Sequence, residues 1–433
     1  MNLYTLALAR ETEGRPVRVG LIGAGKFGSM FLAQVPTTRG LRVSAIADLS
    51  PVRARAACAN VGWTEEMIAA TRFVDSAIDM IQSKDVDVVV EATGHPAAGI
   101  KHAQAAIRAK KHIIMVNVEA DVLAGPLLAR QAAEAGVVYS LAYGDQPAII
   151  CELVDWARSC GFEVIAAGKG TRYLPAFHAS TPDTVWKFRG VDPEAAKLGG
   201  MNAQMFNSFI DGTKSGIEMA AVANATGLTA APDGLAFPPC SVGQLPHKLS
   251  VGPGKLHHKG QVEVVSSVER DDTTVPNDLR WGVFVVFSAP NAYTMRCFKE
   301  YGVVTDASGT LAALHRPFHL IGLELNVSIF SAALRGEPTG SPKAFVADVV
   351  ATAKRDLKPG EILDGEGGYL VWGRLMPAAQ SLNIGGLPIG LASDLKLKRS
   401  VAAGSCLTWS DVEINAADEA YQVRKEMERM FSP

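Results

Sequence analysis

Three glycines and an acidic residue have the spacing of a dinucleotide-binding site. Gly23, Gly25 and Gly28 directly follow the apolar run 17–22. Asp48 ends the next apolar run, 20 residues after the last of these glycines. In such a layout the first glycine allows a tight turn, the second lets backbone approach a pyrophosphate, and the third permits close packing of helix on strand. The spacing therefore predicts an NAD(P) site, with an ordinary glycine-rich turn as the alternative.

The preference between NAD and NADP is left open by the local residues. Asp48 can accept a hydrogen bond from the adenosine ribose 2′-hydroxyl and repel a 2′-phosphate, which favours NAD. Arg53 follows five residues later and can accommodate that phosphate, which favours NADP.

A phosphate cradle is predicted where an alanine-rich helix begins. Asp211, Thr213, Lys214 and Ser215 precede the helical pattern of residues 216–228. Backbone amides and a lysine at a helix start can bind a phosphate. The alternative is an ordinary helix cap with a solvated lysine that pairs with the carboxylate four residues later.

Two basic residues flank a glycine just beyond the predicted strand 163–168. Lys169 and Arg172 can bind a phosphate or polarise a carbonyl group from such a loop. A solvated basic loop explains them equally well.

Two histidines and an arginine surround a proline where the pattern predicts that a helix starts. His315 and His319 can share a face as acid–base or anion-binding groups, and Arg316 can clamp a phosphate. Histidines that cap a buried helix are the alternative. No third ligand accompanies the histidines, so we assign no metal-ligating residues.

The elements that must position these residues alternate between strands and helices in the first third of the chain. Apolar runs at 42–47, 85–92, 112–116 and 137–142 predict strands, each followed by a helical pattern. This alternation predicts an α/β fold with a doubly wound parallel sheet, which binds ligands at the carboxyl ends of its strands. The loops at that edge add seven predicted cofactor contacts: Lys26, Phe27, Thr93, Gly94, Asn117, Glu119 and Gly144.

The composition limits the classes of protein that this chain can be. Its 433 residues are 48% hydrophobic and carry a formal charge of −2, which predicts packed domains and neither a nucleic acid nor a membrane as partner. No run reaches the ~18–20 apolar residues of a membrane helix. Six scattered cysteines without CxxC spacing indicate a reducing compartment, and we expect a cytoplasmic protein.

Several motifs resemble known families. The order of VRVGLIGAGKFG, VVVEATGHP and KHIIMVNVEADVL resembles the cofactor domain of homoserine dehydrogenases. KRDLKPGEILDGEGGY and SVAAGSCLTWSDVEI resemble a SAF-type domain. The combination, with FIDGTKSGIEMAAVANATGL and ALHRPFHLIGLE, is similar to the 1-deoxy-D-xylulose 5-phosphate reductoisomerase-like proteins.

That resemblance implies a function in isoprenoid precursor synthesis. The implied reaction is the NADPH-dependent conversion of 1-deoxy-D-xylulose 5-phosphate to 2-C-methyl-D-erythritol 4-phosphate by a homodimer, with Mg²⁺ or Mn²⁺ as a further cofactor candidate. It also implies three domains: a Rossmann domain (1–155), an α+β substrate and dimerisation domain (156–338) and a small β-rich SAF-like domain (339–433). Two alternatives remain: a dehydrogenase of homoserine or another sugar phosphate that does not rearrange its substrate, and a non-catalytic NADPH sensor.

The reaction needs cationic groups and a proton-transfer pair near the nicotinamide. We therefore expect catalytic roles for Lys169, Asp211, Lys214 and His315. We expect the phosphorylated sugar to be bound by the remaining candidates: Arg172, Thr213, Ser215, Arg316 and His319.

Overall fold

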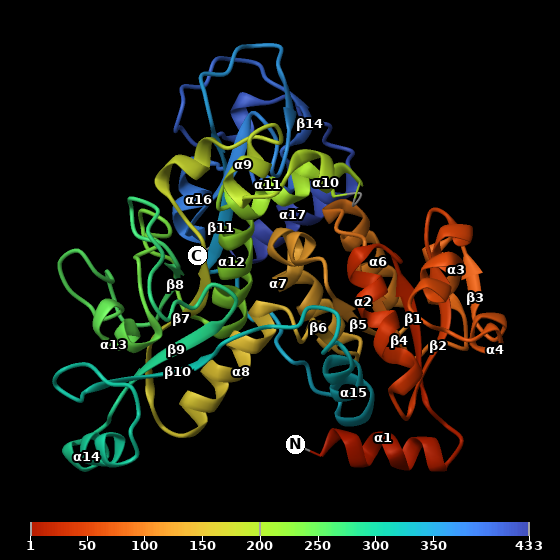
Figure 1. Cartoon of the computed structure of the whole chain (residues 1–433). Coiled ribbons are helices and arrows are strands. Elements are labelled where there is room, and N and C mark those ends of the chain that lie inside the picture. The colour runs from red at the N-terminus through yellow and green to blue at the C-terminus, as the bar shows by residue number, and fades with distance from the viewer. Residues whose placement is uncertain (1, 199–200, 432–433) are drawn as a thin grey trace. The chain divides into compact units, whose positions relative to one another are not determined.

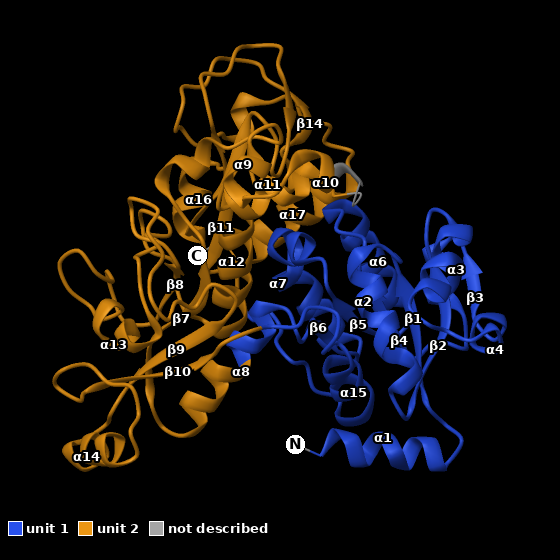
Figure 2. Ribbon diagram, viewed as in Figure 1, with its two compact units in different colours: residues 1–151, 319–343 blue, residues 152–318, 344–433 orange. Residues whose placement is uncertain are grey.

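The computed structural model describes residues 2–198 and 201–431. The chain forms two compact units, one of residues 1–151 and 319–343 and the other of residues 152–318 and 344–433 (Figure 2). The three-domain division stays a prediction. Within the described ranges, no helix is both long and apolar enough to cross a membrane.

The first unit is built on a six-stranded parallel sheet of order β3-β2-β1-β4-β5-β6 (Figure 1). The strands are β1 (Val17–Ile22), β2 (Leu41–Ala47), β3 (Arg72–Val74), β4 (Val88–Glu91), β5 (His112–Met115) and β6 (Tyr139–Leu141). β4 is buried along its whole length, as expected of a parallel strand covered on both faces. The predicted doubly wound sheet is confirmed.

Helices connect these strands. They are α1 (Leu3–Thr12), α2 (Lys26–Gln34), α3 (Pro51–Asn60), α4 (Glu65–Ala69), α5 (Ala77–Gln82), α6 (Pro96–Arg108) and α7 (Val118–Glu134), with the short 3-10 turn η1 (Val35–Thr37). The returning helix α15 (Asn326–Arg335) also belongs to this unit, because Ile329 and Phe330 join the same buried cluster as Leu21 and Val90. The chain passes into the second unit within α8 (Gln146–Ser159).

The second unit holds a four-stranded mixed sheet of order β10-β9-β7-β8. Its strands are β7 (Glu163–Thr171), β8 (Gln261–Ser266), β9 (Val283–Ser288) and β10 (Leu311–Arg316). β7 pairs in parallel with β8 and antiparallel with β9. Two small antiparallel pairs follow, β11 (Ala347–Ala353) with β13 (Val371–Pro377) and β12 (Ile362–Asp364) with β14 (Ser393–Lys396). The predicted α+β and small β-rich parts are therefore confirmed.

The long helix α12 (Thr213–Thr226) packs against β8, β11 and β13 and is almost wholly buried. The other helices are α9 (Val185–Arg189), α10 (Pro193–Leu198), α11 (Ala203–Ile210), α13 (Leu245–Lys248), α14 (Ala292–Glu300), α16 (Ala378–Ile384) and α17 (Glu419–Phe431). Four 3-10 turns complete the unit: η2 (Pro175–Ala179), η3 (Val242–Gln244), η4 (Ile389–Leu391) and η5 (Trp409–Asp411).

Two local predictions were wrong. Lys169 lies inside β7 and not in a loop, because β7 continues through two glycines whose neighbours leave no room for a side chain. A Cβ on Gly168 would come within 1.7 Å of the Glu263 carbonyl oxygen, and one on Gly170 within 1.8 Å of the Leu279 carbonyl oxygen. Such close backbone approach requires glycine and is invisible to a propensity argument.

The second wrong prediction concerns the histidine cluster. His315 and Arg316 end the antiparallel strand β10, where His315 is opposite Phe284 of β9. The helix expected to follow at once begins only at Asn326. Pro317 ends the strand because it has no backbone N–H to continue the ladder.

Candidate functional site

The glycine loop after β1 has the geometry that a dinucleotide needs. Gly23 has a φ of +93°, and a Cβ on Gly28 would lie 2.4 Å from the Gly23 carbonyl oxygen. A Cβ on Gly25, by contrast, would meet nothing within 4 Å. Gly25 also caps α2, whose first residues are Lys26 and Phe27. The loop is therefore tight where the fold requires it and open where a pyrophosphate would approach the helix N-terminus.

Asp48 accepts hydrogen bonds from the backbone of this loop and forms an ion pair with Arg53. Its carboxylate accepts hydrogen bonds from the backbone N–H groups of Ala24 and Ser50, both at 2.9 Å. The Arg53 guanidinium donates to the same carboxylate at 2.8 Å while its side chain stays 66% exposed. Burial favours the neutral form of Asp48, but the two amides and Arg53 outweigh it and lower its pKa. The end of β2 thus presents an ionised carboxylate and an exposed guanidinium together.

The ends of β4 and β5 bring two predicted contacts, Thr93 and Asn117, to one polar cluster. The buried carboxylate of Glu91 accepts from the Thr93 hydroxyl at 2.5 Å and lies 3.1 Å from Nδ1 of His102. Its second oxygen, Oε2, has no hydrogen-bond partner among the described residues. Asn117 Nδ2 donates to Thr93 Oγ1 at 3.4 Å. Sequence reasoning missed Glu91 and His102, although a carboxylate that ends an apolar strand was a visible signal.

The other predicted cofactor residues in this unit occupy loop and helix-start positions. Gly94 has a φ of +68° and Gly144 a φ of +93°, both in turns after strands. Glu119 lies in the first turn of α7, where its charge complements the helix dipole.

A buried carboxylic acid lies in the same first turn of α7. Asp121 is fully buried and accepts a 2.9 Å hydrogen bond from the Tyr139 hydroxyl. Burial raises the pKa of Asp121 to about 7, and its Oδ2 has no partner within the described residues. Its neutral form is therefore favoured at mildly acidic pH.

In the second unit, a buried ion pair joins the sheet to α12. The Lys169 ammonium of β7 contacts the Glu218 carboxylate of α12, and both side chains are more than nine-tenths buried. Lys214 precedes Glu218 by one helical turn, on the same face of α12. A desolvated ammonium beside a carboxylate can hold and pass a proton. Glu218, considered in the sequence only as a surface partner of Lys214, is the carboxylate that Lys169 contacts.

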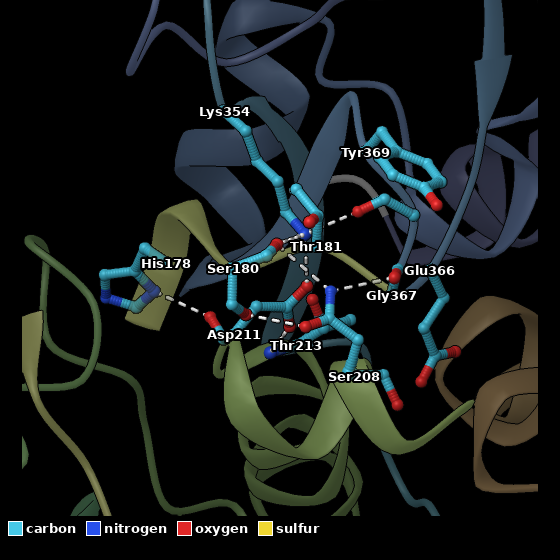
Figure 3. A network of polar contacts seen from close by, with 12 residues as sticks. His178, Ser180, Thr181, Ser208, Asp211, Thr213, Lys354, Glu366, Gly367 and Tyr369 are labelled. Carbon is cyan, nitrogen blue, oxygen red and sulfur yellow. Dashed lines mark hydrogen bonds and ion pairs between the residues drawn. The ribbon is translucent and has the colours of Figure 1, made fainter. Parts of the chain in front are cut away.

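Asp211 lies at the centre of a second buried network, shown in Figure 3. The Lys354 ammonium donates to Asp211 Oδ2 at 2.8 Å and to the carbonyl oxygens of Ser180 and Gly368, both at 2.7 Å. The other Asp211 oxygen accepts from the Thr213 amide at 2.9 Å. Burial raises the pKa of Asp211, and Lys354 opposes that rise.

These contacts favour a structural role for Asp211 and Thr213. The Thr213 hydroxyl accepts from the backbone N–H of Gly373 in β13 at 2.8 Å. Both side chains thereby tie the start of α12 to the C-terminal segment. Ser215 is buried in the first turn of the same helix.

The remaining predicted substrate residues are spread over other surroundings. Arg172 donates to both oxygens of Asp272 at 2.6 Å and lies over the Phe177 ring. Arg316 lies over the ring of Phe318. His315 and Arg316 end the strand β10, so they do not share a helix face with His319. Within residues 2–198 and 201–431, no group of three histidine, cysteine or acidic side chains could hold a metal ion.

Two family models match consecutive parts of the chain. Residues 23–140 match the family model "Homoserine dehydrogenase, NAD binding domain", and residues 144–325 match "Oxidoreductase DRL, catalytic domain". The chain is an NAD(P)-dependent oxidoreductase. The first match contains the glycine loop and Asp48, and the second contains Lys169 and Glu218.

Individual proteins are similar to this chain over part of its length or at low sequence identity. The homoserine dehydrogenase of Neisseria gonorrhoeae is 31% identical over 112 residues, which are 24% of this chain and 23% of that protein. The chain thus matches only about a quarter of that relative's length. An NAD binding oxidoreductase from Klebsiella pneumoniae has a TM-score of 0.33 and 17% identity, with 71% of this chain and 67% of that chain covered. The myo-inositol dehydrogenase of Lactobacillus casei has a TM-score of 0.29 and 16% identity, with 39% and 50% covered.

Proposed function

We propose that this oxidoreductase uses NADPH to reduce the carbonyl group of a small phosphorylated sugar. The observation that carries the proposal is the buried Lys169–Glu218 pair, which lies inside the segment matched to an oxidoreductase catalytic domain. The NAD-binding domain match, which precedes that segment in the chain, supports the binding of the cofactor that such a reduction needs.

Each charged group has a distinct task in this proposal. Bound NADPH would supply the hydride. Lys169 donates a proton to the oxygen of the carbonyl group as it is reduced, and Glu218 positions the Lys169 ammonium through the contact between them. Lys214, one turn before Glu218 on α12, binds the substrate phosphate.

The choice of NADPH rests on Arg53. Its guanidinium is exposed while the Asp48 carboxylate next to it already accepts two backbone amides. An exposed guanidinium at the end of β2 can bind a 2′-phosphate, and its positive charge offsets the repulsion from Asp48.

Two substrates fit this function. The first is 1-deoxy-D-xylulose 5-phosphate, whose carbon skeleton would rearrange by retro-aldol and aldol steps before the resulting aldehyde is reduced; the DGTKSG segment and the SAF-like motifs support it. The second is another sugar phosphate that is reduced without rearrangement. A different function, the oxidation of homoserine with NADP⁺, is the alternative that the homoserine-dehydrogenase-type match supports. We also propose that the protein acts as a homodimer, which light scattering on the purified chain would test.

One experiment separates these substrates. Purified protein is incubated with NADPH, Mg²⁺ and 1-deoxy-D-xylulose 5-phosphate, and in parallel with NADP⁺ and homoserine, and products are identified by NMR. 2-C-methyl-D-erythritol 4-phosphate would support the rearrangement, whereas an unrearranged alcohol or an oxidised homoserine would support the simple dehydrogenase. NADPH binding without turnover of any phosphorylated sugar would contradict the proposal and favour a sensor.

A variant pair tests the role of Lys169. Lys169→Met should lower kcat by at least a hundredfold, because proton transfer by a positioned side chain contributes about 10²–10⁴-fold. Lys259→Met is the matched control, since Lys259 forms an exposed ion pair with Glu163 at the start of the same strand β7. Equal kcat values for the two variants would contradict the role of Lys169 as the proton donor.

A further inference from the structure

The second unit contains a cavity that the proposed reaction does not use. It has a volume of about 180 Å³, well above the ~10–15 Å³ that admits one water molecule. Its walls include the rings of His178, Phe237 and Trp372, the guanidinium-bearing Arg374, and the start of α12 at Gly212. The cavity therefore lies between α12 and the C-terminal strand β13, within one unit.

One wall is a histidine in a fixed neutral form. His178 Nδ1 lies 2.7 Å from the Asp211 carbonyl oxygen, and Nε2 lies 2.8 Å from the Tyr173 hydroxyl (Figure 3 shows the first contact). A carbonyl oxygen only accepts, so Nδ1 carries the hydrogen and Nε2 accepts from Tyr173. Burial lowers the pKa of His178, and the nearby charges of Lys354 and Arg374 lower it further. Trp372 stacks on this ring at 3.9 Å.

A second aromatic residue of the lining, Phe237, is held in an unfavourable backbone conformation. Phe237 has a φ of +50°, a region that bulky residues rarely adopt. Its backbone N–H donates to the buried Glu263 carboxylate at 3.3 Å, and its carbonyl accepts from Arg270 at 3.1 Å. Its ring stacks on Tyr173 at 3.9 Å and 13°. The surrounding structure thus maintains a strained backbone conformation at Phe237 beside the cavity, as is often found at ligand sites.

The polar side chains of the cavity lining include Arg374, the indole of Trp372, Thr352 and Asp233, which is exposed to solvent. Arg374 donates through one Nη2 to the Asp233 carbonyl oxygen at 3.1 Å. Across the described parts of the chain, neither its other donors nor the indole N–H of Trp372 has a hydrogen-bond partner. Trp372 and Arg374 are two apart in β13 and so face the same side of the strand. The fourteen-residue helix α12 adds its partial positive charge at the same place.

We propose that this cavity binds a small organic anion with a flat apolar body. Its carboxylate or phosphate contacts Arg374 and the Trp372 N–H, and its body packs against the aromatic walls. Such a ligand matches the Arg374 and Trp372 donors and the aromatic rings of the lining, and solvent screens the charge of the exposed Asp233 that also lines the cavity. The site is independent of the proposed reaction, so failure of one does not decide the other.

The test uses 4-fluorobenzoate as the probe and the full chain, measured both with and without added NADPH. Fluorine NMR line widths report binding without any turnover. We expect 4-fluorobenzoate to bind in the millimolar range or tighter and its neutral analogue, 4-fluorobenzyl alcohol, to bind at least about tenfold more weakly. Arg374→Gln should weaken 4-fluorobenzoate binding by a similar factor.

Matched variants separate this site from general effects. Arg355→Gln removes another arginine of the C-terminal segment, one that pairs with Glu361 at the surface, and should leave probe binding unchanged. Trp372→Phe keeps the ring and removes the indole N–H, and should weaken binding by a smaller factor. No binding up to 10 mM (about the weakest useful range), equal binding of both probes, or unchanged binding by Arg374→Gln would overturn the proposal.

Discussion

The buried pair of Lys354 and Asp211 offers the sharpest stability test, through Lys354→Met. Both side chains are at most 2% exposed, and the ammonium makes three hydrogen bonds of 2.7–2.8 Å. Methionine fills a similar volume but leaves the Asp211 carboxylate buried without a counter-charge, which costs about 3–5 kcal/mol. In a unit of roughly 250 residues, at ~2 °C per kcal/mol, the second unit should melt about 6–10 °C lower.

The assay is differential scanning calorimetry of the full chain at two pH values. The pKa of Asp211 is already raised in the folded state, and loss of Lys354 removes the group that opposes the rise. A group with a raised folded pKa favours folding at low pH and loses that contribution as pH increases. The melting temperature of Lys354→Met should therefore fall further below wild type at pH 8 than at pH 5.

Two comparisons make this reasoning refutable. The double variant Lys354→Met/Asp211→Asn should regain part of the loss, since no charge stays buried. The exposed ion-pair variant Lys259→Met should shift melting by less than about 2 °C, because surface pairs contribute ~0–1 kcal/mol. A Lys354→Met shift as small as that control, or a double variant that loses the sum of both single losses, would refute the account of this network.

Three further predictions concern the first unit. Gly25→Val should fold with an unchanged melting temperature, since a Cβ at this position meets nothing within 4 Å. The variant should bind NADPH at least about tenfold more weakly in calorimetric titration, and an unchanged affinity would contradict the cofactor site. Arg53→Gln should raise KM for NADPH about tenfold or more without raising KM for NADH, and a parallel rise in both would contradict the 2′-phosphate assignment. Asp121→Asn should lessen the fall in the free energy of unfolding between pH 4.5 and 7, because the raised pKa of Asp121 makes its ionisation oppose folding in this range. Glu134→Gln, at the exposed end of α7, should follow wild type. Coincident curves of unfolding free energy against pH for Asp121→Asn and wild type would refute a buried titrating acid.

The cofactor unit could be predicted in detail because its signals are local. Apolar runs such as 17–22 lie next to the turns that end them, and the acid at Asp48 is only one strand away from the glycines. In a parallel α/β fold the order of elements then determines which loops meet. Even the pairing of Thr93 with Asn117 follows from adjacent strands that end at one edge.

The second unit resisted such reasoning because its key contacts join distant segments. Glu218 meets Lys169 across 49 residues, and Lys354 meets Asp211 across 143. No periodicity relates residues so far apart, and neither partner has a distinctive neighbour in sequence. The strand position of Lys169 could not be predicted either. Glycines at 168 and 170 favour a loop, and only the neighbouring backbone in the structure explains why a strand needs them there.

Isotope transfer from the cofactor tests the central claim most directly. NADPH carrying deuterium at C4 of the nicotinamide, prepared as each of the two stereoisomers, is incubated with the wild-type protein, Mg²⁺ and 1-deoxy-D-xylulose 5-phosphate. We predict that product formed with one stereoisomer is heavier by one deuterium by mass spectrometry, and that Lys169→Met lowers the rate of its formation at least a hundredfold. NADPH binding without labelled product from this or any other phosphorylated sugar would contradict the claim that the chain reduces such substrates.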